Sequence, residues 1–162
     1  MKGEVIQDDH VIHLLFSANR WEAAEQIETD INAGITVVVD RYYYSGIVYS
    51  AAKDRPDLDL QWAREPDVGL PRPDICIFLD LAPEVAMTRG GFGSEKYETS
   101  KMQEKVRKLF YELLKRPDGE DMVLIDAGRS LDNVRRDMRA LTAEALQGER
   151  LNKPLRTISR WA

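Results

Sequence analysis

The chain has 162 residues, of which 43% are apolar and 31% charged, and its 23 basic and 28 acidic side chains give a net charge of −5. This length suits one compact domain, and the composition argues against a disordered or low-complexity chain. The acidic balance argues against nucleic acid as a partner, and no apolar run approaches the roughly 20 residues that a membrane span needs. The single cysteine, Cys76, excludes an internal disulfide, so we expect a reducing compartment, the cytoplasm or the nucleus.

Three short runs rich in β-branched residues predict strands at residues 35–39, 75–81 and 122–125. Each run is continuously apolar, which is typical of parallel strands that are covered on both faces. Helical patterns lie before, between and after these runs. We therefore expect an α/β protein with three parallel strands and flanking helices.

The first helix is predicted to start at Asp8 or Asp9, either of which can cap it, and to end before Gly34. A short helix should follow residues 40–42, and the three prolines within residues 65–74 predict a loop. The helical repeat of the first helix predicts a buried stripe made of Leu14, Ala18, Trp21, Ile27 and Ile31.

The second half of the chain predicts three more helices. Pro83 suits the first turn of a short helix that follows the second predicted strand. Apolar residues spaced by three and four predict an amphipathic helix over residues 102–114, and Ser130 can cap a last long helix. The predicted buried residues of that last helix are Leu131, Val134, Met138, Leu141 and Ala145.

Phe16 and Arg20 lie one turn apart on the first helix, on a side away from its predicted buried stripe. One interpretation is a Phe packed against a neighbouring helix beside an ion-paired Arg, and periodicity alone slightly favours it. The other is a ligand site, in which the ring stacks on a nucleobase while the guanidinium donates hydrogen bonds to a base or a phosphate.

Asp40 and Arg41 directly follow the predicted strand at residues 35–39. The carboxyl ends of parallel strands are where open α/β sheets bind their ligands. Arg41 could therefore grip a phosphate, and Asp40 could hold Mg²⁺ through water or orient Arg41.

Two later segments also combine glycine with charge. Residues 89–98 contain three glycines together with Arg89 and Tyr97, and such a loop could form a lid over phosphates. Residues 126–130 follow the third predicted strand and place Arg129 at the ligand side of the sheet. An ordinary surface loop and an ordinary capped turn remain the alternatives.

Four sequence blocks stand out when they are taken together. They are Leu-Leu-Phe-Ser-Ala-Asn-Arg-Trp-Glu at 14–22, Asp-Arg-Tyr with Ser-Gly at 40–46, Pro-Asp-Val-Gly-Leu-Pro at 66–71, and the glycine-rich block at 89–98. In this order and at these intervals they resemble thymidylate kinase of the eukaryotic type. The resemblance runs from about residue 4 to residue 161.

The resemblance implies roles for particular residues. Phe16 would stack on the thymine of dTMP and Arg20 would bond to the base. Arg41 would hold the dTMP phosphate near the transferring group, with Asp40 beside it. The other implied contacts are Ser45 and Gly46 lining the acceptor site, Tyr49 beside the sugar, Tyr97 and Gln103 closing the nucleotide pocket, and Arg89 and Arg129 near the adenine of ATP.

The implied reaction is the ATP-dependent phosphorylation of dTMP to dTDP in dTTP biosynthesis, with Mg²⁺ and in a homodimer. The implied fold is that of P-loop NTPases of the nucleoside monophosphate kinase kind. Such proteins carry Gly-x-x-x-x-Gly-Lys-[Ser/Thr], whose backbone N–H groups cradle the donor phosphates. None of the ten glycines of this chain are spaced by five, so the motif is absent.

In the family, this motif lies on the first strand and the first helix. We therefore expect a partial P-loop NTPase-like fold that is missing its first two strands and leaves strand edges unpaired. Residues 1–162 would form a single incomplete domain with acceptor-site helix, lid and C-terminal part, and the chain by itself would be inactive. The alternative is a non-catalytic dTMP-binding or interaction module derived from the same family.

Overall fold

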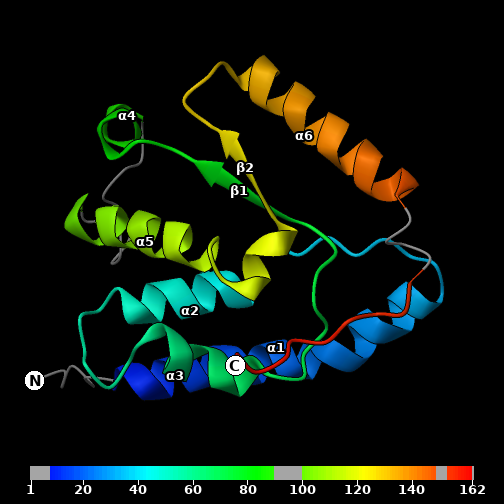
Figure 1. Ribbon diagram of the computed structural model, residues 1–162, viewed down its shortest axis with the longest axis horizontal. Coiled ribbons are helices and arrows are strands. Elements are labelled where there is room, and N and C mark those ends of the chain that lie inside the picture. Colours follow the sequence, from blue (N-terminus) through cyan, green and yellow to red (C-terminus); the bar gives the residue numbers. More distant parts are fainter. Residues whose placement is uncertain (1–7, 90–99, 149–152, 162) are drawn as a thin grey trace, which may run out of the picture. The chain divides into compact units, whose positions relative to one another are not determined.

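The computed structural model describes residues 8–89, 100–148 and 153–161 (Figure 1). Contacts within the chain divide it into two compact units. The first unit consists of Met1–Arg72 together with Leu155–Ala162, and the second unit is Pro73–Pro154. Across the part of the chain that is described, no helix is long and apolar enough to cross a membrane.

The first unit is helical. It contains α1 (Asp9–Asn32), α2 (Tyr43–Ala51), α3 (Leu60–Arg64) and the 3₁₀ turn η1 (Glu65–Asp67). Asp8 caps α1 by accepting a hydrogen bond from the His10 backbone N–H, and the chain leaves α1 through Gly34 at φ +81°, as predicted. α3 and η1 were not predicted, and η1 occupies the start of the expected loop.

The buried face of α1 differs from the predicted one. The residues that α1 buries are His13, Ser17 and Ala24. Leu14 and Trp21 are 46% and 44% exposed and Ala18 is exposed as well, so the predicted stripe is wrong at these three residues, whereas its other two members, Ile27 and Ile31, are partly buried. The reason is that polar side chains with specific partners on α2 and η1, rather than the larger apolar ones, face the interior.

The strand predicted at residues 35–39 is also wrong. This segment is irregular and pairs with no strand in the described ranges. Val38 is 90% exposed, and Ile35 and Val39 are about half exposed. Its composition suits a buried strand, but a strand also needs a neighbour to accept and donate its backbone hydrogen bonds. Asp40 and Arg41 therefore follow an irregular segment and not the end of a sheet strand.

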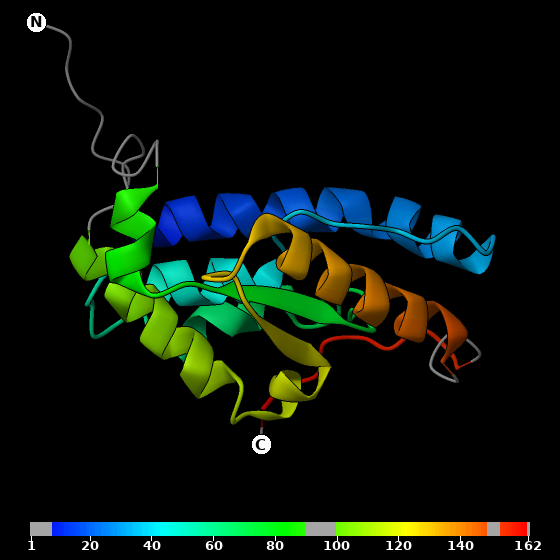
Figure 2. The same ribbon diagram turned by 90° about the horizontal axis from the view of Figure 1, so that it is seen from above.

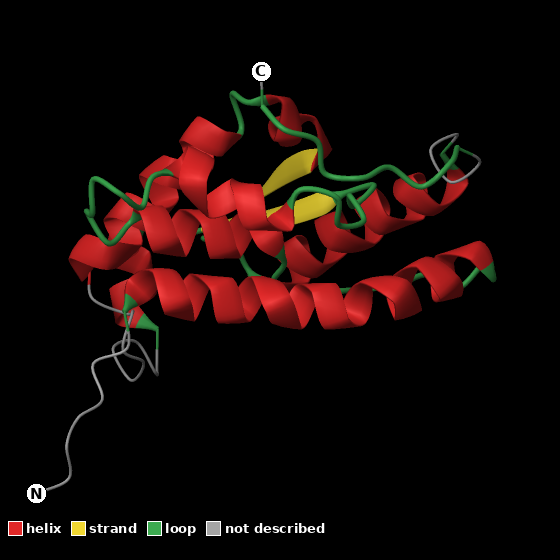
Figure 3. Cartoon of the chain, turned by 90° about the horizontal axis from the view of Figure 1, so that it is seen from below, coloured by secondary structure: helices red, strands yellow, loops and turns green. Residues whose placement is uncertain are grey.

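The second unit holds the sheet, which has two parallel strands instead of three in the described part of the chain. β1 (Cys76–Asp80) and β2 (Met122–Asp126) pair so that Cys76 lies opposite Met122 and Asp80 opposite Asp126. Figure 3 shows strand only in this pair. The predictions at 75–81 and 122–125 are thereby confirmed, and the α/β class holds.

Helices flank this strand pair as predicted. They are α4 (Pro83–Thr88), α5 (Ser100–Leu113) and α6 (Leu131–Gln147), with the 3₁₀ turn η2 (Pro117–Asp121) before β2. Figures 1 and 2 show α5 and α6 on opposite sides of the two strands. Phe110 of α5 stacks on Phe78 of β1 with 4.3 Å between the ring centroids. Ser130 caps α6, but Leu131 is exposed, so the predicted buried stripe of α6 is wrong at that residue.

The C-terminal segment completes the first unit by pairing with the loop that follows η1. Gly69 N–H donates to the Ile158 carbonyl, and Ile158 N–H donates to the Leu70 carbonyl, both at 2.9 Å. Ile158 is almost completely buried, and the guanidinium of Arg64 lies over the Trp161 ring. These contacts hold the loop that follows η1 in place.

Candidate functional site

Arg20 of α1 is held by Asp67 of η1 in a two-point ion pair. Arg20 Nε donates to Asp67 Oδ1 at 3.0 Å and Nη2 donates to Oδ2 at 2.7 Å. The two side chains are 11% and 0% exposed, so the pair is shielded from water. Ser17, one turn earlier on α1, also donates to Asp67 Oδ1 at 2.7 Å. The fold therefore fixes the direction of the Arg20 guanidinium.

η1 is fastened to α1 by further contacts in the same helical turn. Trp21 Nε1 donates to the Pro66 carbonyl at 2.8 Å, and Ser17 Oγ lies 3.1 Å from the same oxygen. Gly69 has φ +102°, and a Cβ there would lie only 3.0 Å from the Trp21 ring. Only glycine suits this position, because a side chain would meet both backbone strain and the indole.

Phe16 lies one turn before Arg20 and is 62% exposed. This exposure contradicts the interpretation that Phe16 packs against a neighbouring helix. The same interpretation expected an ion-paired Arg20, and that part is confirmed, although the pair is shielded and not at the surface. α1 thus presents an uncovered aromatic ring next to an oriented guanidinium.

The start of α2 faces these side chains at Gly46. A Cβ on Gly46 would lie 3.1 Å from both Nη1 and Nη2 of Arg20, so glycine allows the guanidinium to lie directly against the α2 backbone. Ser45 and Tyr49, on the same short helix, are partly buried. The Arg41 guanidinium lies 5.6 Å from the centre of the Tyr49 ring, within the range of a cation–π contact.

Arg41 adopts φ +62°, a left-handed conformation that is uncommon for a residue with a side chain. Such conformations cost about 1 kcal/mol or more and cluster at functional sites. Asp40 and Arg41 are both exposed. Within residues 8–89, 100–148 and 153–161, no carboxylate forms an ion pair with Arg41, which leaves its positive charge uncompensated there.

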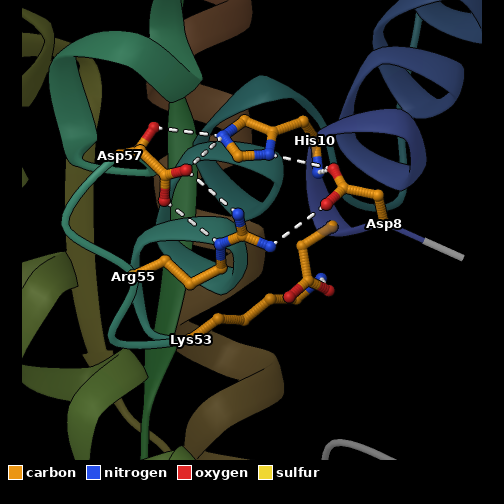
Figure 4. Close-up of polar contacts among 6 residues, drawn as sticks. Asp8, His10, Lys53, Arg55 and Asp57 are labelled. Atoms are coloured by element: carbon orange, nitrogen blue, oxygen red, sulfur yellow. Dashed lines mark hydrogen bonds and ion pairs between the residues drawn. The ribbon is translucent and has the colours of Figure 1, made fainter. Parts of the chain in front are cut away.

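A polar cluster fixes the N-terminal end of α1, and Figure 4 shows His10 between Asp8 and Asp57. His10 Nδ1 lies 2.9 Å from Asp8 Oδ1, and Arg55 donates both to Asp8 and, through two nitrogens, to Asp57. The carbonyl of Asp57 and then the Asp8 carboxylate raise the pKa of His10. Hydrogen bonds from the backbone and ring of His10 lower the pKa of Asp8 to about 2. Beside this cluster, Lys53 donates to Asp9 at 2.7 Å.

A buried histidine joins α1 to α2 one turn further along. His13 Nδ1 lies 2.7 Å from Ser50 Oγ, and both residues are buried. Burial lowers the pKa of His13, so the ring is neutral at pH 7. Together with the Asp8 cluster, this contact positions the α1 turn that carries Phe16 and Arg20.

In the second unit, charged residues gather where β1 and β2 end. Asp80 accepts from Arg107 Nε at 2.6 Å and Nη2 at 2.8 Å, and from the Tyr111 hydroxyl at 2.7 Å. The Arg107 hydrogen bonds, followed by that of Tyr111, lower the pKa of Asp80. Asp126, opposite Asp80 in register, accepts from the Gly128 N–H at 2.8 Å. This cluster keeps α5 attached to the end of β1.

The residues that the resemblance assigns to ATP lie in this second unit. Arg89 Nη2 donates to the Ala127 carbonyl at 2.6 Å, and Arg129 pairs with Asp137. Arg89 and the loop that carries Arg129 are thus in contact, while Gln103 lies on α5. Tyr97 and the glycine-rich loop fall outside the described residues.

Among the described residues, no group of three or more His, Cys, Asp or Glu side chains is arranged so that it could hold a metal ion. The exposed Asp40 carboxylate is compatible with Mg²⁺, which proteins often hold through one or two carboxylates, waters and substrate phosphates.

Burial raises the pKa of the Cys76 thiol to about 11, so this thiol stays protonated at neutral pH.

Comparison with known proteins decides the family. The sequence profile described as "Thymidylate kinase" matches residues 2–138. The chain belongs to the thymidylate kinase family. It is 51% identical over 136 residues to the thymidylate kinase of Schizosaccharomyces pombe and 42% identical over 140 residues to that of Homo sapiens, which supports the eukaryotic type. The solved structure of Candida albicans thymidylate kinase superimposes with a TM-score of 0.83 at 33% identity, over 94% of this chain and 74% of that one.

This family member covers only part of the proteins to which it is similar. The matches span 83% and 86% of this chain but 63% and 65% of the Schizosaccharomyces pombe and Homo sapiens thymidylate kinases. The resemblance seen in the four sequence blocks is confirmed by these matches. The assignment of individual residues to dTMP and ATP stays a prediction.

Sequence reasoning missed two residues that organise the charged groups. Asp67 was noted only as part of a sequence block, and Asp80 was not singled out at all. Each had a readable signal. Asp67 is an acid within a proline- and glycine-rich segment, and Asp80 ends an otherwise apolar run, as Asp40 does. Neither pattern indicates which residue the aspartate contacts, because the partners, Arg20 of Asp67 and Arg107 of Asp80, are distant in sequence.

Proposed function

We propose that this protein binds dTMP and serves its ATP-dependent phosphorylation to dTDP in dTTP biosynthesis. The observation that carries the proposal is the exposed Phe16 ring one turn from the fixed Arg20 guanidinium on α1. A pyrimidine can stack on the ring, since base–aromatic stacking contributes about 1–3 kcal/mol, while Arg20 donates to its edge. Membership of the thymidylate kinase family supports thymine as the base.

The charges around α2 suit the phosphate of the same nucleotide. Arg41 has no ion-paired carboxylate in the described ranges, so its charge is available to a phosphate in a way that the charge of Arg20 is not. Tyr49, against which Arg41 lies, would contact the sugar. Ser45 and Gly46 would line the acceptor site, and Tyr97 and Gln103 would close the nucleotide pocket.

For the donor side we propose that Arg89 and Arg129 contact the adenine of ATP. Mg²⁺, held through water by Asp40, would neutralise phosphate charge during transfer. Phosphoryl transfer depends almost entirely on positioning and charge neutralisation of the donor phosphates. Because the 162 residues contain no phosphate-cradling glycine motif, we infer that this chain alone binds dTMP without transferring phosphate.

We also propose that residues 1–162 belong to one thymidylate-kinase-like domain and that the protein acts as a homodimer. Val11, Leu14 and Leu15 are 46% to 57% exposed and lie on one face of α1, opposite its buried face. An apolar stripe of this kind suits a second copy of the same helix, since two-fold interfaces are self-complementary. Leu15→Arg should give a monomer in sedimentation velocity, whereas Leu131→Arg on α6 should not.

The test of the function is a calorimetric titration with dTMP combined with an assay for ADP release from ATP. We expect saturable dTMP binding by the wild type, no such binding by Arg41→Ala, and no ADP release by this chain alone. A wild type without dTMP affinity contradicts the proposal. The non-catalytic binding module is the second candidate, supported by the absent glycine motif; it predicts binding without turnover even in a longer form of the protein that includes such a motif.

A further inference from the structure

The carbonyl of Pro71 is held in place by the C-terminal segment of the first unit. On one side of Pro71, Arg72 N–H donates to the Arg156 carbonyl at 2.8 Å. On the other side, the Leu70 carbonyl accepts from Ile158 N–H at 2.9 Å. Pro71 itself is buried. Because the peptide groups on both sides are paired, the Pro71 carbonyl is an acceptor in a fixed position.

Tyr42 bonds to this fixed acceptor. Its hydroxyl donates to the Pro71 carbonyl at 3.1 Å, across 29 residues of sequence. Its ring meets the completely buried Tyr43 ring edge-on, with 5.5 Å between the centroids. Burial raises the pKa of Tyr42 to about 12, so the hydroxyl remains a donor at neutral pH. The carbonyl of Tyr42 accepts from Ser45 N–H at 3.1 Å at the start of α2, so Tyr42 is anchored by its hydroxyl, its ring and its backbone.

Arg41 directly precedes this anchored residue and has an uncommon backbone conformation. Its φ is +62°, whereas Tyr42 is extended at φ −136°. A left-handed residue with a side chain persists only where the surrounding structure holds it. On its other side, the chain arrives from the irregular segment at residues 35–39, which pairs with no strand in the described ranges. The restraint on Arg41 therefore comes from Tyr42.

The Arg41 guanidinium is the group that we expect to bind the dTMP phosphate. It lies 5.6 Å from the centre of the Tyr49 ring, and no carboxylate in the described part of the chain pairs with it. A guanidinium binds phosphate through a planar fork of N–H groups, so the direction of the side chain matters as well as its charge. That direction depends on the backbone from which the side chain starts.

We propose that Tyr42 is a positioning residue: its hydroxyl bond to the Pro71 carbonyl holds Arg41 in the left-handed conformation that directs the guanidinium to the dTMP phosphate. This inference rests on the proposed function. Tyr42 acts through Arg41 and makes no contact with the nucleotide itself. Removal of the hydroxyl should therefore weaken the phosphate contact and leave the contacts of the base unchanged.

The test compares the wild type with Tyr42→Phe, which keeps the ring and removes only the hydroxyl. Isothermal titration calorimetry of the full chain gives the Kd of dTMP, and phosphorus NMR at saturating dTMP gives the pKa of the bound phosphate. A free phosphate monoester has a second pKa of about 6, which an adjacent guanidinium lowers. We expect Tyr42→Phe to weaken dTMP binding about fivefold, the factor that one lost hydrogen bond carries. The pKa of the bound phosphate should rise towards its free value.

Two further variants separate positioning from folding. Thr142→Val removes a hydroxyl whose bond to the Met138 carbonyl lies within α6, and it should change neither quantity. In an Arg41→Lys background, Tyr42→Phe should weaken dTMP binding less than about twofold, because lysine binds phosphate as a point charge on a flexible stem. The pKa of the bound phosphate is read only from folded, ligand-bound protein, so a general loss of stability does not move it.

The outcomes distinguish the inference from the function on which it rests. A wild type that does not bind dTMP contradicts the proposed function. A wild type that binds dTMP, with the same Kd in Tyr42→Phe, overturns the positioning role alone. Weaker binding by Tyr42→Phe with an unchanged pKa of the bound phosphate would also overturn it, since Tyr42 would then support the fold and not the phosphate contact. Equal effects of Tyr42→Phe in the wild-type and Arg41→Lys backgrounds would do the same.

Discussion

Replacing Phe16 by Ala tests whether its ring binds dTMP or only stabilises the fold, because the two roles predict different losses of binding free energy and of the free energy of unfolding. The side chain is 62% exposed, and full burial of a Phe side chain contributes about 1.5–3 kcal/mol, so the ring contributes only about 1 kcal/mol or less to folding. A base stacked on the ring contributes roughly 1–3 kcal/mol, or a factor of about 5 to 150 in Kd. We therefore expect Phe16→Ala to weaken dTMP binding by more than it lowers the free energy of unfolding.

The assay pairs calorimetric titration with dTMP and urea unfolding followed by circular dichroism. Phe16→Leu is a useful second variant, because it keeps apolar bulk but removes the aromatic face, and it should lose most of the affinity too. Leu131→Ala, at a similarly exposed apolar residue of α6, should leave dTMP affinity unchanged. An unchanged Kd in Phe16→Ala, or a loss of stability greater than the loss of binding free energy, would refute the stacking role.

The remaining predictions concern stability and reactivity. The pKa of His10 is raised in the folded protein, so its contribution to stability is complete below about pH 6.5 and is lost as the pH rises through the higher folded value. The difference in Tm between the wild type and His10→Gln should therefore shrink as the pH is raised. Gly69→Ala should lower the free energy of unfolding by about 1–3 kcal/mol, because strain and the Trp21 ring both oppose it, whereas Gly34→Ala, with nothing within 4 Å, should lower it by about 1 kcal/mol. Cys76 should react with iodoacetamide at pH 8 at least about 100-fold more slowly in the folded than in the unfolded protein, since burial raises its pKa to about 11.

Each of these expectations has a clear contrary result. A Tm difference for His10→Gln that is independent of pH contradicts the role of the Asp8 cluster. Equal destabilisation by the two glycine substitutions means that the indole contact is unimportant. Equal alkylation rates of folded and unfolded chains mean that Cys76 is accessible.

The sequence predicts local structure well where one signal suffices. Asp8 and Gly34 bound α1, Pro83 begins α4 and Ser130 caps α6, because capping and proline effects depend on neighbouring residues alone. Strand formation depends on a partner instead. Residues 35–39 are richer in β-branched side chains than residues 122–126, yet only the latter find a hydrogen-bonding neighbour in the described part of the chain.

The candidate site is predictable as a set of residues but not as an arrangement. Phe16 and Arg20 are correctly placed on one side of α1 by helical spacing alone. Helical spacing does not predict which face of α1 is buried. That face contains His13 and Ser17, whose hydrogen-bond partners lie 37 and 50 residues away in the sequence. The helical repeat is read from large apolar residues, so it does not indicate a face whose polar side chains are buried because they form hydrogen bonds.

The irregular segment at residues 35–39 has a practical consequence. Ile-Thr-Val-Val-Val carries neither charge nor proline, and its most outward residue, Val38, is 90% exposed. Stretches of this composition are templates for cross-β aggregation between molecules, so we expect this segment to promote fibril formation in concentrated preparations of the chain. Lysine at position 38 would act as a gatekeeper and raise the concentration at which thioflavin-positive material forms.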